Sequence, residues 1–299
     1  VSKHPADDDK QEVSHYPADV YERASLFRKG AALGAYTHSK GSTLVRKMIS
    51  EFIERRDETG NDVDIESIYL TDGASPGVKT SLQLLTSSPD DGILIPIPQY
   101  PLYSASITNL RGTAVGYYLD ESKGWRITEE SIETAIEGFY KERPNGKIKG
   151  LVVINPGNPT GNLLSYDELK KIIKICEKHN LILMSDEVYQ ENIWQPNTTW
   201  VSARKVLLEQ NSNVPLFSFH SISKGFTGEC GIRGGYFQLE NVNSDVQDQI
   251  YKLQSVSLCA NTVGQMMMAS SVTPPKAGDA SYELFQSEVE SIKESQRRK

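Results

Sequence analysis

A lysine set among small and hydroxyl residues is the first candidate for chemistry in this chain. In "FSFHSISKGFTGECGIRGGYF", residues 217–237, Lys224 follows an apolar run and Arg233 comes nine residues later. A lysine amine can form a Schiff base with a carbonyl group, and an arginine can bind a phosphate through paired hydrogen bonds. A solvated surface loop is the alternative and the more common place for a lysine. The choice between a reactive lysine and a surface lysine depends on the residues that follow the other apolar runs.

Two carboxylates stand in a similar position after another apolar run. Asp186 and Glu187 follow "LILMS" directly, and Tyr189 comes two residues later. Burying a carboxylate is costly unless it meets a cation or a hydrogen-bond donor, so exposure at a strand tip is the alternative. A buried carboxylate here could instead hold the proton on the nitrogen of a pyridinium ring.

Three further segments offer ligand-binding groups after apolar runs. In "DGASPGV", residues 72–78, Ser75 can cap a helix whose N-terminus would bind an anion, although a plain capped turn is equally compatible with these residues. In "NPGNPTG", residues 155–161, proline and glycine hold Asn158 in a rigid turn with its amide available. Tyr100 in "IPQYPLY" could stack on a flat ligand or simply pack within its loop.

A hydrolase is the alternative that residues 73–77 raise. "GASPG" matches the G-x-S-x-G pattern in which Ser75 would be the nucleophile, with His220 as a possible base. The residue after such a nucleophile donates its backbone N–H to the developing oxyanion, and Pro76 has no N–H. The pattern therefore argues against a serine nucleophile. Walker A and G-x-G-x-x-G phosphate-binding patterns do not occur in residues 217–237.

Composition excludes several classes of protein. The 299 residues carry a net charge of −7, which disfavours a nucleic-acid surface. The three cysteines are far apart, as in proteins of a reducing compartment, and we expect no metal site. No apolar run approaches the roughly 20 residues that cross a bilayer. The polar beginning without Met suggests an internal start, so a targeting segment could precede it.

Apolar runs alternate with helical patterns along most of the chain. Because these runs lack a period of two and are separated by helices, we expect an α/β fold with a parallel sheet covered on both faces. We expect strands at 67–71, 92–98, 113–119, 150–156, 181–187, 214–220 and 234–240, and helices at 42–57, 78–87, 128–142, 165–180 and 281–296. The predicted organisation is an N-terminal segment (1–41), a large domain (42–265) and the incomplete start of a small C-terminal domain (266–299).

The candidate residues stand together in such a fold, because ligands bind at the carboxyl ends of the strands of an open α/β sheet. A lysine for a carbonyl, a carboxylate for a pyridinium nitrogen, phosphate-binding turns with an arginine, and an aromatic cover together describe a site for pyridoxal 5′-phosphate (PLP).

Ordered motifs between residues 34 and 237 strengthen this interpretation. They are "GAYTHSKG", "LTDGASPGV", "PIPQYPLYSA", "NPGNPTGN", "SDEVYQENIW" and "SISKGFTGECGIRGGYF", with a weaker match in "PPKAGDASYELF". In these motifs the chain resembles the class I/II PLP-dependent aminotransferases of fold type I, and "KGFTGECGIRGGY" is similar to their alanine branch. The resemblance implies a mostly parallel seven-stranded sheet with helices on both faces and a small C-terminal domain.

The resemblance also implies a role for each matching residue. Lys224 would bind the cofactor covalently and carry the substrate proton, and Asp186 would pair with the pyridine nitrogen. Tyr189 and Asn158 would bind the ring oxygen O3′, and Tyr100 would stack on the ring. Residues for the phosphate would be Ala74, Ser75, Ser221, Ser223 and Arg233, with Tyr36 reaching the phosphate of the partner subunit in a homodimer that shares its active sites.

The implied reaction is a ping-pong exchange that converts L-alanine and 2-oxoglutarate to pyruvate and L-glutamate. The family's arginine for the substrate carboxylate is expected beyond residue 299, so we expect these residues alone to bind PLP but to transaminate alanine feebly. The alternatives are another fold type I PLP enzyme, with a different amino donor or a lyase reaction, and an inactive truncated chain that binds PLP. We expect no nucleic-acid or membrane partner, and a location in the cytoplasm or the mitochondrial matrix.

Overall fold

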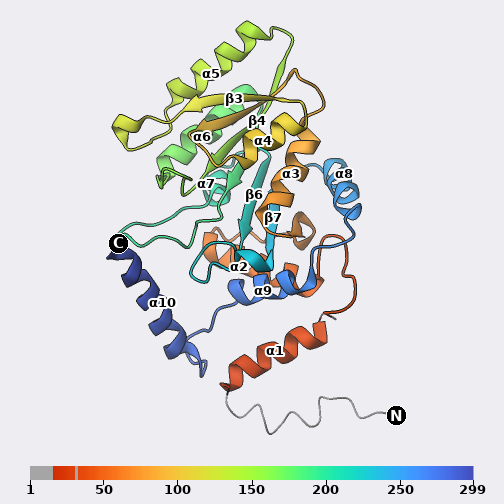
Figure 1. Cartoon of the computed structure of the whole chain (residues 1–299), viewed down its shortest axis with the longest axis vertical. Helices are drawn as coiled ribbons and strands as arrows, with labels where there is room; N and C mark the ends of the chain where they lie inside the picture. The colour runs from red at the N-terminus through yellow and green to blue at the C-terminus, as the bar shows by residue number, and fades with distance from the viewer. Residues whose placement is uncertain (1–15, 31–32, 299) are drawn as a thin grey trace.

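A single seven-stranded sheet forms the centre of the computed structural model, which describes residues 16–30 and 33–298 (Figure 1). Its strands are β1 (Ile68–Thr71), β2 (Asp91–Ile97), β3 (Thr113–Tyr118), β4 (Lys147–Ile154), β5 (Ile182–Asp186), β6 (Leu216–Ser221) and β7 (Gly235–Glu240), in the spatial order β1-β7-β6-β5-β4-β2-β3. Strands β2 to β6 pair in parallel, and β7 runs antiparallel to both of its neighbours. The predicted mostly parallel seven-stranded sheet is therefore confirmed.

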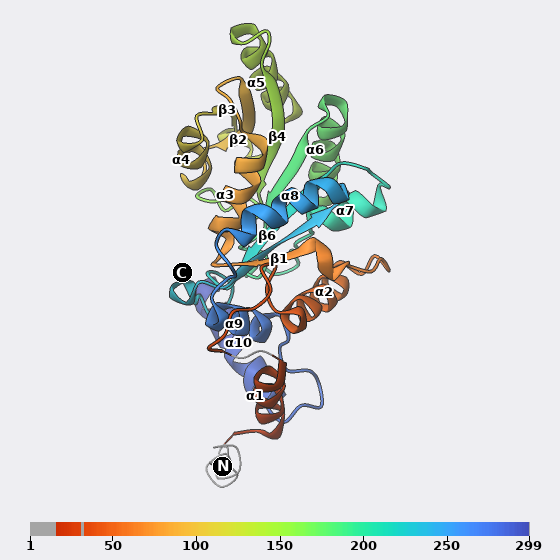
Figure 2. The same cartoon turned by 90° about the vertical axis from the view of Figure 1, so that its right-hand side faces the viewer.

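Helices cover both faces of the sheet. They are α1 (Ala18–Gly30), α2 (Thr43–Asp57), α3 (Ala74–Leu85), α4 (Leu102–Asn109), α5 (Glu129–Glu142), α6 (Tyr166–His179), α7 (Ala203–Glu209), α8 (Ser244–Ser255), α9 (Thr262–Val272) and α10 (Tyr282–Arg297). Figure 2 shows α4 and α6 on opposite sides of the strands. Helices α5, α6 and α7 contribute to one apolar core, and α3, α4 and α8 contribute to another.

The central strands are apolar throughout because both of their faces are buried. Along β4, Leu151 and Val153 belong to the core with α5 and α6, whereas Val152 and Ile154 belong to the core with α3 and α4. Successive side chains of a strand point to opposite faces, so a doubly covered strand needs apolar residues at every position. This burial explains the uninterrupted apolar run from which the strand was predicted.

Helix boundaries follow capping residues that the sequence contains. Ser165 accepts a hydrogen bond from the backbone N–H of Glu168, and the Glu168 carboxylate accepts from the backbone N–H of Ser165, which forms a capping box at the start of α6. Thr128 caps α5 in a similar way. The predicted helices at 128–142 and 165–180 are therefore confirmed to within one residue at each end.

Several helices were not predicted. Residues 18–30 lack a strong helical period in the sequence but form α1, and α4, α7, α8 and α9 were also missed. Short helices and weakly amphipathic ones give little periodic signal and depend on tertiary packing. The predicted division of the chain at residue 265 stays a prediction, and that residue lies within α9, which packs against α2 in a third apolar core.

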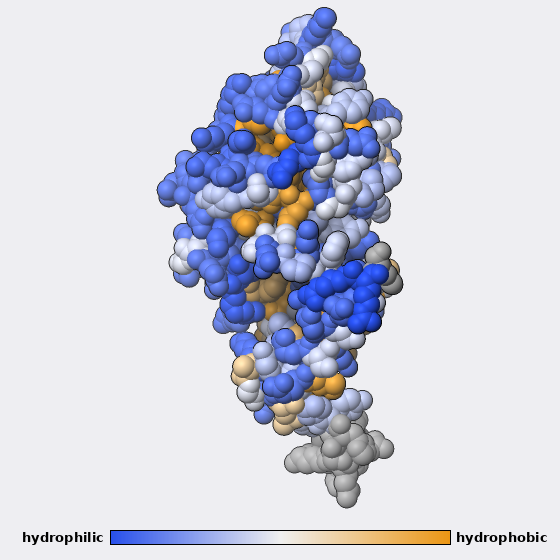
Figure 3. All heavy atoms as spheres, turned by 90° about the vertical axis from the view of Figure 1, so that its left-hand side faces the viewer, coloured by the Kyte–Doolittle hydropathy of each residue, from blue (hydrophilic) through white to orange (hydrophobic). Residues whose placement is uncertain are grey.

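The molecular surface is mainly hydrophilic on the side shown in Figure 3, with apolar residues in its hollows. Helix α10 contains no fully buried residue. Within the described residues, no helix combines the length and apolar character that a membrane crossing requires.

Candidate active site

A cavity of about 210 Å³ lies where β4, β5 and β6 end. It brings together every predicted cofactor-binding residue except Tyr36. Tyr36 is 80% exposed, and its predicted role toward a partner subunit stays a prediction. The complete lining is Ala74, Ser75, Tyr100, Leu102, Ile154, Asn158, Asp186, Val188, Tyr189, Ser221, Ser223, Lys224, Cys230 and Arg233. Sequence reasoning did not identify Leu102, Ile154, Val188 or Cys230, because three are ordinary apolar residues and the fourth is a single cysteine.

Asp186 is the buried acid of this cavity. It ends β5 and is 5% exposed, so the alternative of an exposed strand-tip carboxylate is wrong for this residue. Tyr103 donates a hydrogen bond of 2.8 Å to Oδ2, and the backbone N–H of Val188 lies 3.4 Å from Oδ1. Burial raises the pKa of Asp186, and the Tyr103 hydrogen bond, the Val188 amide and the positive charge of Lys224 act in the opposite direction.

Tyr103 is the functional residue that sequence reasoning missed. Its hydroxyl reaches Asp186 from α4, 83 positions away in the chain. Its signal in the sequence was weak: in "QYPLY" it comes three residues after Tyr100, but Tyr100 precedes α4 whereas Tyr103 lies within it. Tyr100 lines the cavity and is half-exposed, whereas Tyr103 is fully buried.

Lys224 enters the cavity from the loop after β6. Its Nζ lies 5.2 Å from the centre of the Tyr189 ring, and the amide nitrogen of Asn158 lies 3.3 Å from the Tyr189 hydroxyl. The next residue, Gly225, has a φ of +75°, and Asn192 both donates to its carbonyl at 3.0 Å and accepts from its N–H at 2.8 Å. This pair of hydrogen bonds fixes the backbone beside the lysine.

A cationic cradle forms at the N-terminus of α3. The Arg233 guanidinium donates to the Asp72 carbonyl at 2.9 Å and lies 3.4 Å from the Ser223 hydroxyl. Gly73, with a φ of +82°, precedes the helix, and a Cβ at that position would collide with the guanidinium. The free N–H groups of a helix N-terminus and an adjacent guanidinium together attract a phosphate.

Glu187 points away from the cavity, although it follows Asp186 directly. One carboxylate oxygen accepts hydrogen bonds from the Ala203 N–H at 2.9 Å and the Ser185 hydroxyl at 3.0 Å, and the other lies 3.6 Å from Arg56. Burial raises the pKa of Glu187 to about 7, although the nearby Arg56 charge opposes the shift. The side chain belongs to a buried ionic cluster behind the site.

His220 has the wrong position and ionisation for a hydrolase base. It is buried, stacks on Phe52, and does not line the cavity that holds Ser75. Burial and the Arg56 charge lower its pKa to about 3. Together with Pro76, this placement argues against the serine-hydrolase alternative.

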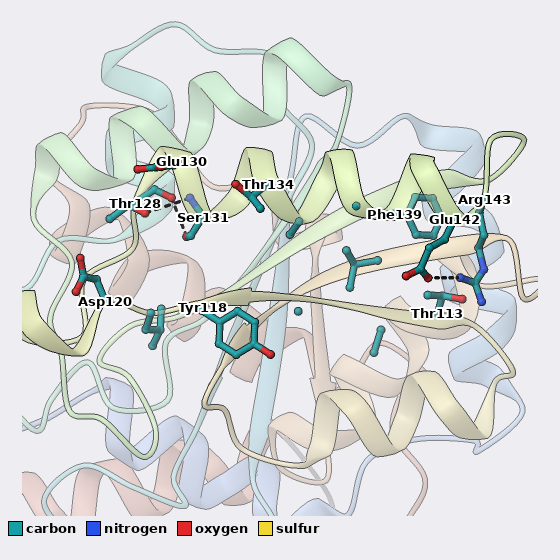
Figure 4. Close-up of a pocket in the computed structure, with 16 residues that line it drawn as sticks. Thr113, Tyr118, Asp120, Thr128, Glu130, Ser131, Thr134, Phe139, Glu142 and Arg143 are labelled. Carbon is teal, nitrogen blue, oxygen red and sulfur yellow. Dashed lines mark hydrogen bonds and ion pairs between the residues drawn. The ribbon is translucent and has the colours of Figure 1, made fainter.

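A larger hollow of about 670 Å³ lies elsewhere, between the edge strand β3 and helix α5 (Figure 4). The labelled side chains in Figure 4 include Thr128 beside Ser131 and Glu142 beside Arg143, and no predicted site residue is present. Its ion pair, Glu142–Arg143 at 3.5 Å, lies away from Asp120 and Glu130, so the hollow has no cluster like the one around Lys224. The smaller cavity, where charged and polar groups converge, is therefore the candidate active site. Within the described part of the chain, no group of three or more His, Cys, Asp or Glu side chains is placed to hold a metal ion.

Comparison with known proteins places the chain in a family. The family model for class I and II aminotransferases matches residues 7–298. Glutamate–glyoxylate aminotransferase 1 of Arabidopsis thaliana is 46% identical over 291 residues, which is 95% of this chain and 60% of the relative. Mitochondrial alanine aminotransferase 1 of the same plant is 46% identical over 267 residues, which is 88% of this chain and 48% of the relative.

Solved structures share the fold. An aminotransferase from Escherichia coli superposes with a TM-score of 0.72 at 26% identity, covering 91% of this chain and 66% of that one. The alanine aminotransferase from Pyrococcus furiosus gives a TM-score of 0.74 at 24% identity, covering 94% and 66%. The chain thus spans about half to three fifths of the length of the curated relatives named above. On the match of the family model over almost its whole length, the chain belongs to the family of class I and II aminotransferases.

Proposed function

We propose that this chain forms the cofactor-binding part of a PLP-dependent aminotransferase that converts L-alanine and 2-oxoglutarate to pyruvate and L-glutamate. The observation that carries the proposal is the convergence of Lys224, Asp186 and the Arg233 cradle on one cavity. These groups come from three separate strand ends, and a structural role for each would not require them to meet.

The residues of the cavity fit PLP in charge and in shape. Asp186 is a buried carboxylate that a pyridinium nitrogen would neutralise, and Arg233 with the N-terminus of α3 matches a phosphate dianion. Gly73 leaves the space beside Arg233 that any larger residue would fill. When bound, the PLP ring withdraws electrons from the substrate and so eases loss of the proton from its Cα.

Each side chain then has a specific task. Asp186 holds the proton on the pyridine nitrogen, and Tyr103 keeps that carboxylate charged and oriented. Lys224 binds the cofactor and moves the proton at the substrate Cα. Tyr189 and Asn158, which lie within 3.3 Å of one another, orient the ring oxygen, and Tyr100 covers the ring.

The substrate carboxylate needs a separate partner. Arg233 belongs to the phosphate cradle, and it is the one arginine that lines the cavity within the described residues. Arg297 and Arg298 lie on or directly after α10 and pair with Glu290 and Glu294. These contacts agree with the expectation that another arginine, beyond residue 299, binds the carboxylate.

A second candidate function is transamination of glyoxylate. It is favoured by the 46% identity to a relative named for glutamate and glyoxylate, which equals the identity to the plant alanine aminotransferase. Comparing keto acid products for alanine and glutamate as donors, with 2-oxoglutarate and glyoxylate as acceptors, separates the two. We also propose a homodimer with shared active sites, to which Tyr36 contributes, in the cytoplasm or the mitochondrial matrix.

The test of the proposal is covalent labelling. After incubation with PLP and reduction with borohydride, peptide mapping is expected to place the pyridoxyl group on Lys224. The Lys224→Ala variant should take up no label, whereas Lys79→Ala, which changes an exposed lysine of α3, should be labelled like the unchanged chain. A label on a different lysine contradicts the assignment.

A further inference from the structure

Asn261 ties together three segments around the phosphate cradle. Its side-chain nitrogen donates to Asp72 Oδ1 at 2.8 Å and to the backbone carbonyl of Arg233 at 2.9 Å. Its side-chain oxygen accepts from the N–H of Gly264 at 2.6 Å and so caps α9, and its own backbone N–H donates to Asp72 Oδ1 at 2.8 Å. The side chain thus links the end of β1, the Arg233 loop and the start of α9.

Two of the segments that Asn261 joins, the Arg233 loop and the start of α9, are in close backbone contact. Arg233 has a φ of +62°, an unusual conformation for a side chain of this size. A Cβ on Gly264 would lie 2.5 Å from the Arg233 carbonyl oxygen, so the two backbones are in direct contact. The hydrogen bond from Asn261 to that carbonyl therefore holds Arg233 in the conformation that directs its guanidinium toward Asp72 and Ser223.

The hydrogen bonds from Asn261 to Asp72 also affect the electrostatics around Arg233. Its backbone carbonyl accepts a hydrogen bond from the Arg233 guanidinium at 2.9 Å, so a carboxylate of the same residue that lacked donors of its own would compete for this arginine. Two N–H groups of Asn261 occupy Oδ1 of that carboxylate. These hydrogen bonds reduce the free energy that the Asp72 carboxylate would gain by pairing with the Arg233 guanidinium. The guanidinium therefore stays available for a phosphate.

We infer that Asn261 is a positioning residue for the cofactor phosphate: it holds Arg233 in place and keeps the Asp72 carboxylate from competing for it. The inference rests on the proposed function, because it assigns the Arg233 cradle to the phosphate of PLP. It predicts that a change at Asn261 alters recognition of the phosphate and leaves recognition of the pyridoxal ring unchanged.

Asn261→Asp is the sharpest variant. Aspartate is as good a helix cap as asparagine and is favourable at a helix N-terminus, so α9 stays capped. The substitution removes both side-chain donors and adds a second carboxylate beside Asp72. The matched control is Asn243→Asp, because Asn243 caps α8 through the N–H of Asp245 at 2.8 Å and does not line the cavity.

The experiment compares equilibrium affinities for PLP and for pyridoxal, which lacks the phosphate. We expect the unchanged chain to prefer PLP, and Asn261→Asp to lose about tenfold in PLP affinity, as for one hydrogen bond to a charged group. Its affinity for pyridoxal should differ from that of the unchanged chain by less than about twofold. Asn243→Asp should keep both affinities, and thermal unfolding should show all three chains folded.

Each contrary result has its own meaning. An unchanged preference for PLP in Asn261→Asp overturns the inference, and so does an equal loss for both ligands, which would indicate a purely structural cap. A chain that binds neither ligand at Lys224, or binds both equally before any substitution, contradicts the proposed function itself.

Discussion

Replacing Tyr103 with phenylalanine removes one oxygen atom from beside Asp186 and leaves the buried ring in place. The lost contact is a 2.8 Å hydrogen bond between two groups that are both buried. A hydrogen bond to a charged group contributes about 1.5–3 kcal/mol, and 1.4 kcal/mol corresponds to a factor of ten in affinity. In the variant, the equilibrium between ionised and protonated Asp186 should therefore shift by a factor of about ten or more toward the protonated form.

The direction of the pH dependence follows from this loss. Burial already raises the pKa of Asp186, and the Tyr103 hydrogen bond opposes that shift. Without the hydroxyl the pKa rises further, so protons compete more strongly with the pyridinium nitrogen for the carboxylate. PLP affinity should therefore fall by up to about tenfold, and the deficit should widen as the pH falls and narrow as it rises.

The assay is equilibrium binding of PLP between about pH 6 and pH 9, followed by absorbance of the bound cofactor. Tyr117→Phe is the matched control, because Tyr117 is equally buried and donates at 2.7 Å to the backbone carbonyl of Val152, which carries no charge. It should lose some stability but keep its affinity for PLP. The reasoning is refuted if Tyr103→Phe binds PLP like the unchanged chain at every pH, or if both variants lose affinity equally.

Two further predictions concern carboxylates whose pKa is raised by burial, Asp186 fully and Glu191 partly enclosed. Asp186→Asn should raise the reaction barrier by about 3–5 kcal/mol while thermal unfolding stays the same or improves, because an amide avoids the cost of a buried charge; near-normal turnover would show that the carboxylate has no part in the reaction. Burial raises the pKa of Glu191 from 4.5 to about 7, with Lys293 opposing the shift, so ionised Glu191 destabilises the folded chain increasingly as the pH rises through that interval. The free energy of unfolding of Glu191→Gln should therefore exceed that of the unchanged chain by about 2 kcal/mol at pH 8 after solvent screening, and the two should be equal below pH 4.5. The exposed Glu121→Gln serves as control, and an equal difference at both pH values would refute this account.

The strands of the sheet and the residues at its functional edge could be predicted from local sequence. Lys224, Asp186 and Asn158 were each identified because they follow an apolar run. The carboxyl ends of parallel strands meet at one edge, so position in sequence was enough to bring these residues together. The structure places all three on one cavity.

The family resemblance pointed to Asp186, but the local pattern of residues did not determine which of two consecutive acids would enter that cavity. Asp186 and Glu187 both follow the same run, and side chains of successive residues point in opposite directions. Asp186 meets Tyr103 on one side, and Glu187 meets Ala203, Ser185 and Arg56 on the other. Only the placement of α4 and α7 around β5 decides this difference.

Tyr103 and Asn261 show the same limit over longer distances. Tyr103 lies 83 residues from the carboxylate that it contacts, and Asn261 lies 189 residues from Asp72. Tyr103 stands in the segment after the apolar run 92–98, but nothing in that segment distinguishes it from a packed aromatic residue, and Asn261 follows no apolar run. Sequence determined the groups at the strand ends because backbone periodicity and chain direction place them. Their hydrogen-bond partners depended on the packing of separate helices, which only the tertiary structure decides.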